Sequence, residues 1–70
     1  MSEELQILYM QTRLIHLAAS EWNMSVDEVI DCFSKNKVYE YISECWELFH
    51  VEGDEAVLSE ISDYIRERGK

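Results

Sequence analysis

The sequence predicts an all-α protein, a compact bundle of four helices joined by short turns and forming a single domain over residues 1–70. Three observations indicate this fold class. The chain contains no proline, the residue that most often breaks a helix. Apolar residues recur at intervals of three and four, and no stretch alternates as a half-buried strand would. Hydrophobic residues make up 47% of the chain, which is enough for a packed core despite a net charge of -9.

The first predicted helix covers residues 3–22. Ser2 is suited to cap its N-terminus, and Glu3 and Glu4 favour the positive end of the helix dipole. Apolar residues occupy nearly its whole circumference, so we expect it to be the central helix, covered by the other three.

An alternative is that one apolar seam of this helix stays uncovered and associates with a second copy of the chain or with a partner. A helix of about 20 residues is roughly 30 Å long, and three short helices leave part of such a rod exposed. The seam that would serve this purpose consists of Ile7, Met10, Leu14 and Leu17.

The second predicted helix covers residues 26–35. Ser25 precedes it, and Glu28 follows Ser25 by three residues, which is the spacing of a capping box. In that motif the serine side chain and the glutamate side chain each accept a hydrogen bond from the other residue's backbone N–H. This is the most specific local signature in the sequence.

The third predicted helix covers residues 37–50. Its core side carries apolar residues up to Leu48 and Phe49, and Tyr39 and Trp46 fall at the boundary of that side. The opposite side carries three glutamates in line. They are Glu40, Glu44 and Glu47. Exposed aromatic residues that flank an acidic stripe suit a protein interface. The simpler interpretation is that Tyr39 and Trp46 cover the edge of the core.

The fourth predicted helix covers residues 54–68, and the corner before it has a structural explanation. His50 lies in the last turn of the third helix, where a donor side chain favours the terminal carbonyls. Gly53 is expected in the left-handed conformation that ends a helix, and Asp54 is expected to cap the next one.

Metal and catalytic sites are disfavoured by spacing. The zinc-type ligands of the chain are Cys32, Cys45, His16 and His50, and their spacing matches no familiar zinc motif. The segment "HVEGDE" has neither the length nor the spacing of a calcium loop. A nucleophilic Cys45 would need electropositive surroundings, and its neighbours are acidic. We therefore expect no cofactor and no enzymatic activity.

The charge balance favours a protein as the partner. Fifteen acidic residues face six basic ones, which disfavours nucleic acid and anionic membrane surfaces and favours a basic partner protein. The N-terminus has no basic signal segment, no apolar run approaches the roughly 20 residues of a membrane span, and two cysteines are too few for a disulfide framework. We expect a cytoplasmic location.

The chain also resembles a family of short bacterial proteins classed as a domain of unknown function. The stretch "MSVDEVIDCF" is similar to the family's capped S-x-D-E-V helix start. The stretch "YEYISECWELFHVEGDEAVLSEISDYI" is similar to its Y-I…L-H-x-x-G-x-E…D-I…Y-I pattern. His50, Gly53 and Glu55 match that pattern, and Phe49 departs from it by replacing an aliphatic residue. Family members are often encoded beside ADP-ribosyltransferase-like proteins, so the resemblance implies an antitoxin-like or accessory partner of such an enzyme.

Two functional hypotheses follow. The first is a non-catalytic protein-binding module that docks a basic partner on the acidic, aromatic-edged side of the third helix. Its residues are Tyr39, Glu40, Glu44, Trp46 and Glu47. The second is a small homo-oligomeric structural protein, such as a homodimer, assembled through the seam of the first helix.

Overall fold

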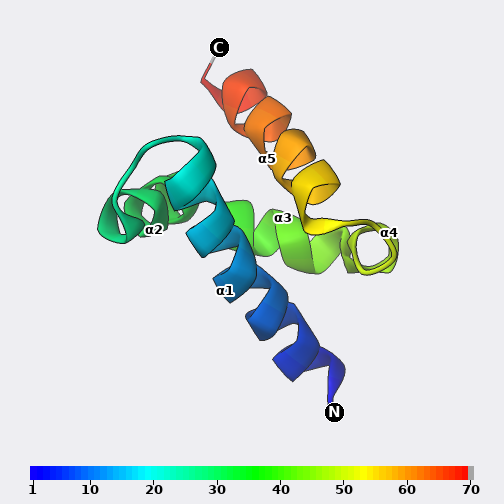
Figure 1. The fold of residues 1–70 in the computed structure, drawn as a ribbon. Helices are drawn as coiled ribbons and strands as arrows, with labels where there is room; N and C mark the ends of the chain where they lie inside the picture. The colour runs from blue at the N-terminus through cyan, green and yellow to red at the C-terminus, as the bar shows by residue number, and fades with distance from the viewer. Residues whose placement is uncertain (70) are drawn as a thin grey trace.

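In a computed structural model, residues 1–69 fold into five α-helices (Figure 1). They are α1 (Glu3–Glu21), α2 (Val26–Lys35), α3 (Val38–Glu44), α4 (Trp46–Phe49) and α5 (Asp54–Arg68). The all-α prediction is confirmed, and the number of helices is one more than predicted. α1 contacts α2, α3 and α5, which is the position of a central helix. The start of α1 and the end of α5 lie at opposite ends of the molecule.

Side-chain caps fix the starts of the first two helices. The Leu5 N–H donates to Ser2 Oγ over 3.2 Å at the start of α1. At α2 the predicted capping box is confirmed: the Ser25 N–H donates to Glu28 Oε1 over 2.8 Å, and the Glu28 N–H donates to Ser25 Oγ over 3.1 Å. The bond from the Ser25 backbone also lowers the pKa of Glu28. Because these signals are local, the sequence predicts both starts.

The prediction of one helix over residues 37–50 is wrong. Cys45 adopts φ -98° and ψ 13°, and this departure from helical geometry separates α3 from α4. α3 is seen from the side in Figure 1, whereas α4 is seen end-on, so the two run in different directions. Trp46 and Phe49 follow this turn, and both side chains are buried in the core.

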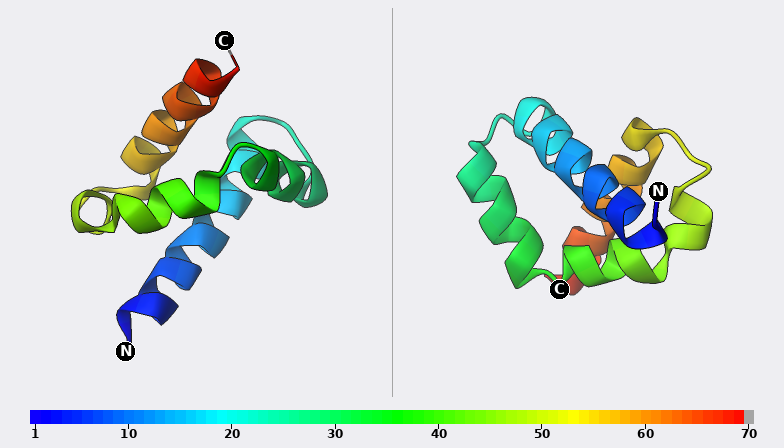
Figure 2. Two further views of the ribbon diagram at one scale, coloured as in Figure 1. Left: turned by 180° about the vertical axis from the view of Figure 1, so that it is seen from behind. Right: turned by 90° about the horizontal axis from the view of Figure 1, so that it is seen from below.

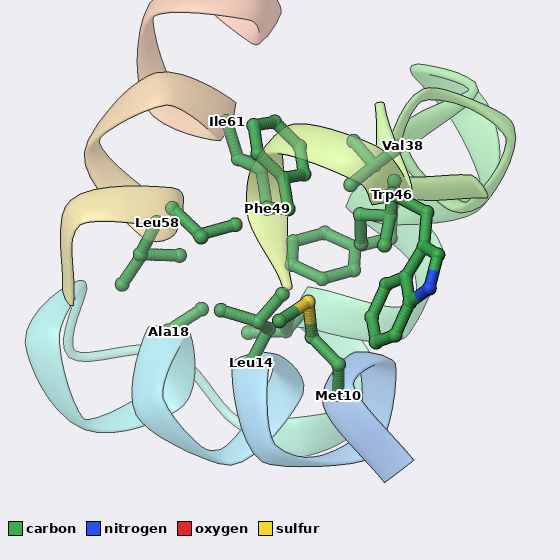
Figure 3. Close-up of a cluster of buried hydrophobic side chains, with 12 residues drawn as sticks. Met10, Leu14, Ala18, Val38, Trp46, Phe49, Leu58 and Ile61 are labelled. Atoms are coloured by element: carbon green, nitrogen blue, oxygen red, sulfur yellow. The ribbon is translucent and has the colours of Figure 1, made fainter. Parts of the chain in front are cut away.

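The core lies between α1 and the helices that surround it. Figure 3 shows this cluster, in which Trp46 of α4 points toward Met10 of α1. Its members are Met10, Leu14, Ala18, Val29, Phe33, Val38, Ile42, Trp46, Phe49, Val57, Leu58 and Ile61. Among the described residues no polar or charged side chain is buried, so every carboxylate of this part of the chain lies at the surface.

The turn at Cys45 also changes which residues face the core. Trp46, expected at an exposed edge, is buried with 8% of its surface accessible, whereas Leu48, expected on the core side, is 66% exposed. Glu47 lies on α4, whereas Glu40 and Glu44 lie on α3, so the three glutamates are divided between two helices that run in different directions.

The seam of α1 that was assigned to oligomerisation belongs to the protein's own core. Met10 and Leu14 are buried, and Ile7 and Leu17 pack half-buried against the same cluster. The assignment of this seam to a second copy is wrong because α2, α3 and α5 approach α1 from this side.

The corner before α5 differs from its prediction in two details. Gly53 is the N-cap residue and has φ -74° and ψ 155°, an extended conformation rather than a left-handed one. Asp54 is the first residue of α5, and its carboxylate accepts hydrogen bonds from Arg13 Nε over 2.9 Å and from Arg13 Nη2 over 3.3 Å. These bonds raise the pKa of Arg13 and tie the start of α5 to α1. His50 is the C-cap of α4, at the helix end where it was expected.

Candidate protein-binding surface

Part of the predicted partner-binding set stays together on the outer side of α3. Tyr39, Glu40 and Glu44 line a shallow groove of about 350 Å³ with Gln11 of α1. Gln11 Nε2 donates to the Tyr39 carbonyl oxygen over 3.2 Å, which attaches this groove to α1. Tyr39 is half-buried with its ring edge-on to Phe33 at 5.8 Å, and burial raises the pKa of its hydroxyl.

The other two members of the set lie elsewhere. Trp46 is in the core, and its ring centroid is 5.4 Å from that of His50. Glu47 is exposed on α4. The position of Trp46 agrees with the simpler interpretation, in which this side chain covers the core. It leaves too little surface for Trp46 to anchor a partner.

A second groove lies between α3 and α5, and carboxylates and tyrosines line it. Its volume is about 280 Å³. We call it the acidic tyrosine groove, and its lining residues are Tyr41, Glu60, Asp63, Tyr64 and Glu67. One of its walls comes from α3, near the middle of the chain, and the other comes from α5, the last helix.

Two stacked tyrosine rings form part of the wall of this groove. The ring centroids of Tyr41 and Tyr64 are 4.0 Å apart and the ring planes differ by 5°. Phe49 supports Tyr41 from the core side, edge-on at 5.4 Å. The Arg68 guanidinium lies 5.6 Å from the centroid of Tyr64, so this ring already interacts with an arginine of its own helix.

Other titratable groups lie close to Glu60, one of the residues that line the acidic tyrosine groove. A hydrogen bond that the protonated Glu52 carboxyl donates to Glu60 raises the pKa of Glu52, and the negative charge of Glu60 adds to the effect. Burial raises the pKa of Tyr41, as do the nearby Cys45 and Glu60. Burial, followed by Glu44 and Glu60, raises the pKa of Cys45. Glu60 is therefore close to groups from three other segments of the chain.

The basic side chains of residues 1–69 are engaged within the protein. Four of them form ion pairs, which are Arg13–Asp54, Lys35–Asp31, Lys37–Glu40 and Arg66–Asp63. The fifth, Arg68, lies over Tyr64. Within this part of the chain Glu44, Glu52 and Glu60 have no ion pair with a basic side chain. A cationic partner would supply the positive charge that these three carboxylates lack within residues 1–69.

The sequence prediction included the nearby Glu44 but missed Glu60 and the two tyrosines that line this groove. Periodicity placed Tyr41 and Tyr64 on core sides, and each is half-buried. The groove combines residues from α3 and α5, which are far apart in the sequence, so no local spacing could reveal it. The only sequence signal is the absence of Lys and Arg between Val38 and Ile65.

Metal-ligating side chains do not converge in the described part of the chain: no group of three His, Cys, Asp or Glu residues could hold a metal ion there. Both cysteines are free thiols. None of the helices in residues 1–69 has the length and apolar character that a bilayer-spanning segment requires.

A family model described as "Protein of unknown function (DUF3791)" matches residues 9–68. The match covers most of the chain, so the protein belongs to this family of uncharacterised function. No curated protein and no solved structure matches the chain. The resemblance seen in the sequence is confirmed as far as an uncharacterised family.

Proposed function

We propose that this member of the family is a non-catalytic binding module that holds an arginine-containing segment of a basic protein in the acidic tyrosine groove. The observation that carries the proposal is the groove itself, in which the carboxylate of Glu60, with Glu52 close to it, lies beside the stacked rings of Tyr41 and Tyr64. A cation placed beside Glu60 and Glu52 would gain two carboxylate partners.

Arginine fits this groove better than lysine does. Its planar guanidinium donates hydrogen bonds in a fork that can engage two carboxylate oxygens at once, and it stacks on aromatic rings. Lysine is a compact point charge without this geometry. The contact between Arg68 and Tyr64 supports the same preference, because it pairs these two chemical groups at the edge of the groove.

Long-range electrostatics would assist the encounter. The net charge is -9, so the protein attracts a basic surface from solution and repels nucleic acid and anionic lipid. We place the interaction in the cytoplasm, in line with the free thiols of Cys32 and Cys45. The family resemblance implies a first candidate for the partner, an ADP-ribosyltransferase-like enzyme encoded beside the gene, which this protein would neutralise or assist.

The proposal can be tested by fluorescence anisotropy with a labelled oligoarginine peptide and an oligolysine peptide of equal length. We expect tighter binding of oligoarginine and a loss of about fivefold or more in affinity for Glu60→Gln. The matched control is Glu55→Gln, which removes the same charge from α5 outside the groove. Equal losses in the two variants, or equal binding of the two peptides, would contradict the proposed site.

A further inference from the structure

The acidic tyrosine groove has a cation of the protein's own at its edge. Arg68, in the last turn of α5, holds its guanidinium 5.6 Å from the ring centroid of Tyr64. Its Nη1 also donates a long hydrogen bond, of 3.5 Å, to the Tyr64 hydroxyl. The free protein therefore already places an arginine side chain against the aromatic wall of this groove.

The tyrosine stack determines which face of Tyr64 this guanidinium covers. The rings of Tyr41 and Tyr64 are 4.0 Å apart and nearly parallel, so no third side chain fits between them. Because a ring has two faces and one of them lies against Tyr41, the guanidinium of Arg68 lies over the other face. A partner's arginine that stacks on Tyr64 needs this same face. The two arginines therefore exclude each other.

We propose that Arg68 is an intramolecular competitor of the partner's arginine: it covers Tyr64 in the free protein, and an arginine of the bound segment takes its place. This inference rests on the function proposed above and adds a regulation of the same site. The carboxylates give the exchange its direction. Glu60 has no ion pair with a basic side chain of residues 1–69, whereas a partner's arginine in the groove would engage Tyr64 and Glu60 together.

Arg68 can leave the ring without a rearrangement of the fold. Its side chain is exposed, and the last turns of α5 project beyond α3 and α4 in Figure 1 and in the left view of Figure 2. The end of the helix is held by the Gly69 N–H, which donates to the Ile65 carbonyl oxygen over 3.1 Å and does not involve the Arg68 side chain. A change of side-chain rotamer is therefore sufficient to uncover Tyr64.

The strength of this competition follows from the contact. A cation–π contact at an exposed site corresponds to a preference of about two- to fivefold for the covered ring over the uncovered one. A ligand that binds only the uncovered state loses affinity in proportion to the fraction of molecules in that state, so Arg68 should weaken arginine binding about three- to sixfold. Lysine pairs with Glu60 as a point charge and gains less from the ring, so Arg68 should compete with lysine less.

The test compares Arg68→Gln with the wild type by fluorescence anisotropy, with the labelled oligoarginine and oligolysine peptides. Arg68→Gln should bind oligoarginine about three- to sixfold more tightly and should gain less for oligolysine. Removal of any positive charge favours both peptides, so the control is Lys35→Gln, which removes a positive charge from an exposed ion pair on α2. Equal gains of Arg68→Gln for the two peptides, or a gain no larger than that of Lys35→Gln, would overturn the proposal.

Side-chain NMR of Arg68 in the wild type measures the exchange itself. The ring of Tyr64 should shift the Arg68 Hδ protons upfield in the free protein, and saturation with unlabelled oligoarginine should return them toward their positions in an unfolded peptide. Upfield shifts that persist at saturation would contradict displacement. The proposed function fails differently, by equal losses in Glu60→Gln and Glu55→Gln. A selective loss in Glu60→Gln without the gain in Arg68→Gln would sink the competition alone.

Discussion

Tyr41 of α3 and Tyr64 of α5 stack with their ring centroids 4.0 Å apart, and the same two rings line the acidic tyrosine groove. The pair therefore serves two purposes. It links α5 to the middle of the chain, and it provides the aromatic wall beside Glu52 and Glu60. Predictions about stability and about binding can be separated by choosing substitutions that keep or remove the ring.

Removing one ring should destabilise the protein. Tyr64→Ala loses the stack on Tyr41 and should lower the free energy of unfolding by about 1–2 kcal/mol, since an aromatic pair contributes roughly 0.5–1.5 kcal/mol beyond its buried area. Tyr64→Phe keeps the ring and should stay within about 0.5 kcal/mol of the wild type. Urea unfolding followed by circular dichroism measures both. Equal stability of the two variants would show that the stack contributes nothing.

The Glu52–Glu60 pair predicts that Glu60→Gln makes the folded protein more stable, by an amount that depends on pH. The pKa of Glu52 is raised above 4.5 in the folded protein, so the folded state holds this proton more tightly than the unfolded state does. The resulting stabilisation is complete below pH 4.5 and is lost as the pH rises through the folded pKa. At neutral pH the two carboxylates repel each other. Glu60→Gln should therefore be more stable than the wild type there.

The gain in stability of Glu60→Gln over the wild type should disappear when Glu52 is protonated. Thermal unfolding at neutral pH and below pH 4.5 should show a higher melting temperature for Glu60→Gln only in the first condition. Glu55→Gln serves as the control, because it removes a charge from α5 without relieving the pair. A gain of the same size at both pH values would rule out the shared proton as its cause.

Cys45 should react slowly with thiol reagents. Burial, followed by the charges of Glu44 and Glu60, raises its pKa, and the thiolate is the reactive form. At neutral pH iodoacetamide should modify Cys45 more slowly in the native protein than in the same protein unfolded in urea. Mass spectrometry of the peptide that contains Cys45 gives both rates. Equal rates would mean that neither burial nor the nearby acids protect this thiol.

Gly53→Ser should stabilise the protein, by about 0.5–1 kcal/mol. The backbone at Gly53 is extended, with φ -74°, and a Cβ atom there would meet nothing within 4 Å. Serine loses less conformational entropy than glycine on folding and can cap α5 with its hydroxyl. Chemical unfolding measures the change. A loss of about 1 kcal/mol would instead indicate the left-handed conformation expected from the sequence.

A position that does require a left-handed backbone provides the contrast. Asn23, in the turn between α1 and α2, has φ 54°. Asn23→Ala should cost about 1 kcal/mol, because a Cβ without a polar side chain disfavours this region, and Asn23→Gly should be nearly neutral. Together with Gly53→Ser, these variants compare the two turns that flank the central part of the chain.

Sequence reasoning succeeded where the cause of a structure is local. The capping box of Ser25 and Glu28 and the apolar period predicted α2 over residues 26–35. The start and end of α5 were also predicted, although Gly53 rather than Asp54 caps it. In each case a few neighbouring residues set the boundary.

Sequence reasoning failed where tertiary packing decides. Neither glycine nor proline marks the turn at Cys45. The burial of Trp46 and Phe49 in the core stabilises this turn. The same turn moved Trp46 inside and separated Glu47 from Glu40 and Glu44. The acidic tyrosine groove was missed for a related reason: its residues come from two helices, α3 and α5, that only the folded chain brings together.

The central claim is that a basic segment binds in the acidic tyrosine groove and not over the acidic surface at large. Backbone chemical-shift mapping of the labelled full chain during titration with an oligoarginine peptide tests it most directly. The account predicts the largest shifts at Tyr41, Glu52, Glu60, Asp63 and Tyr64, with small shifts at Glu3, Asp27 and Glu55. Shifts of similar size at all these acidic positions, or their concentration on another face, would contradict it.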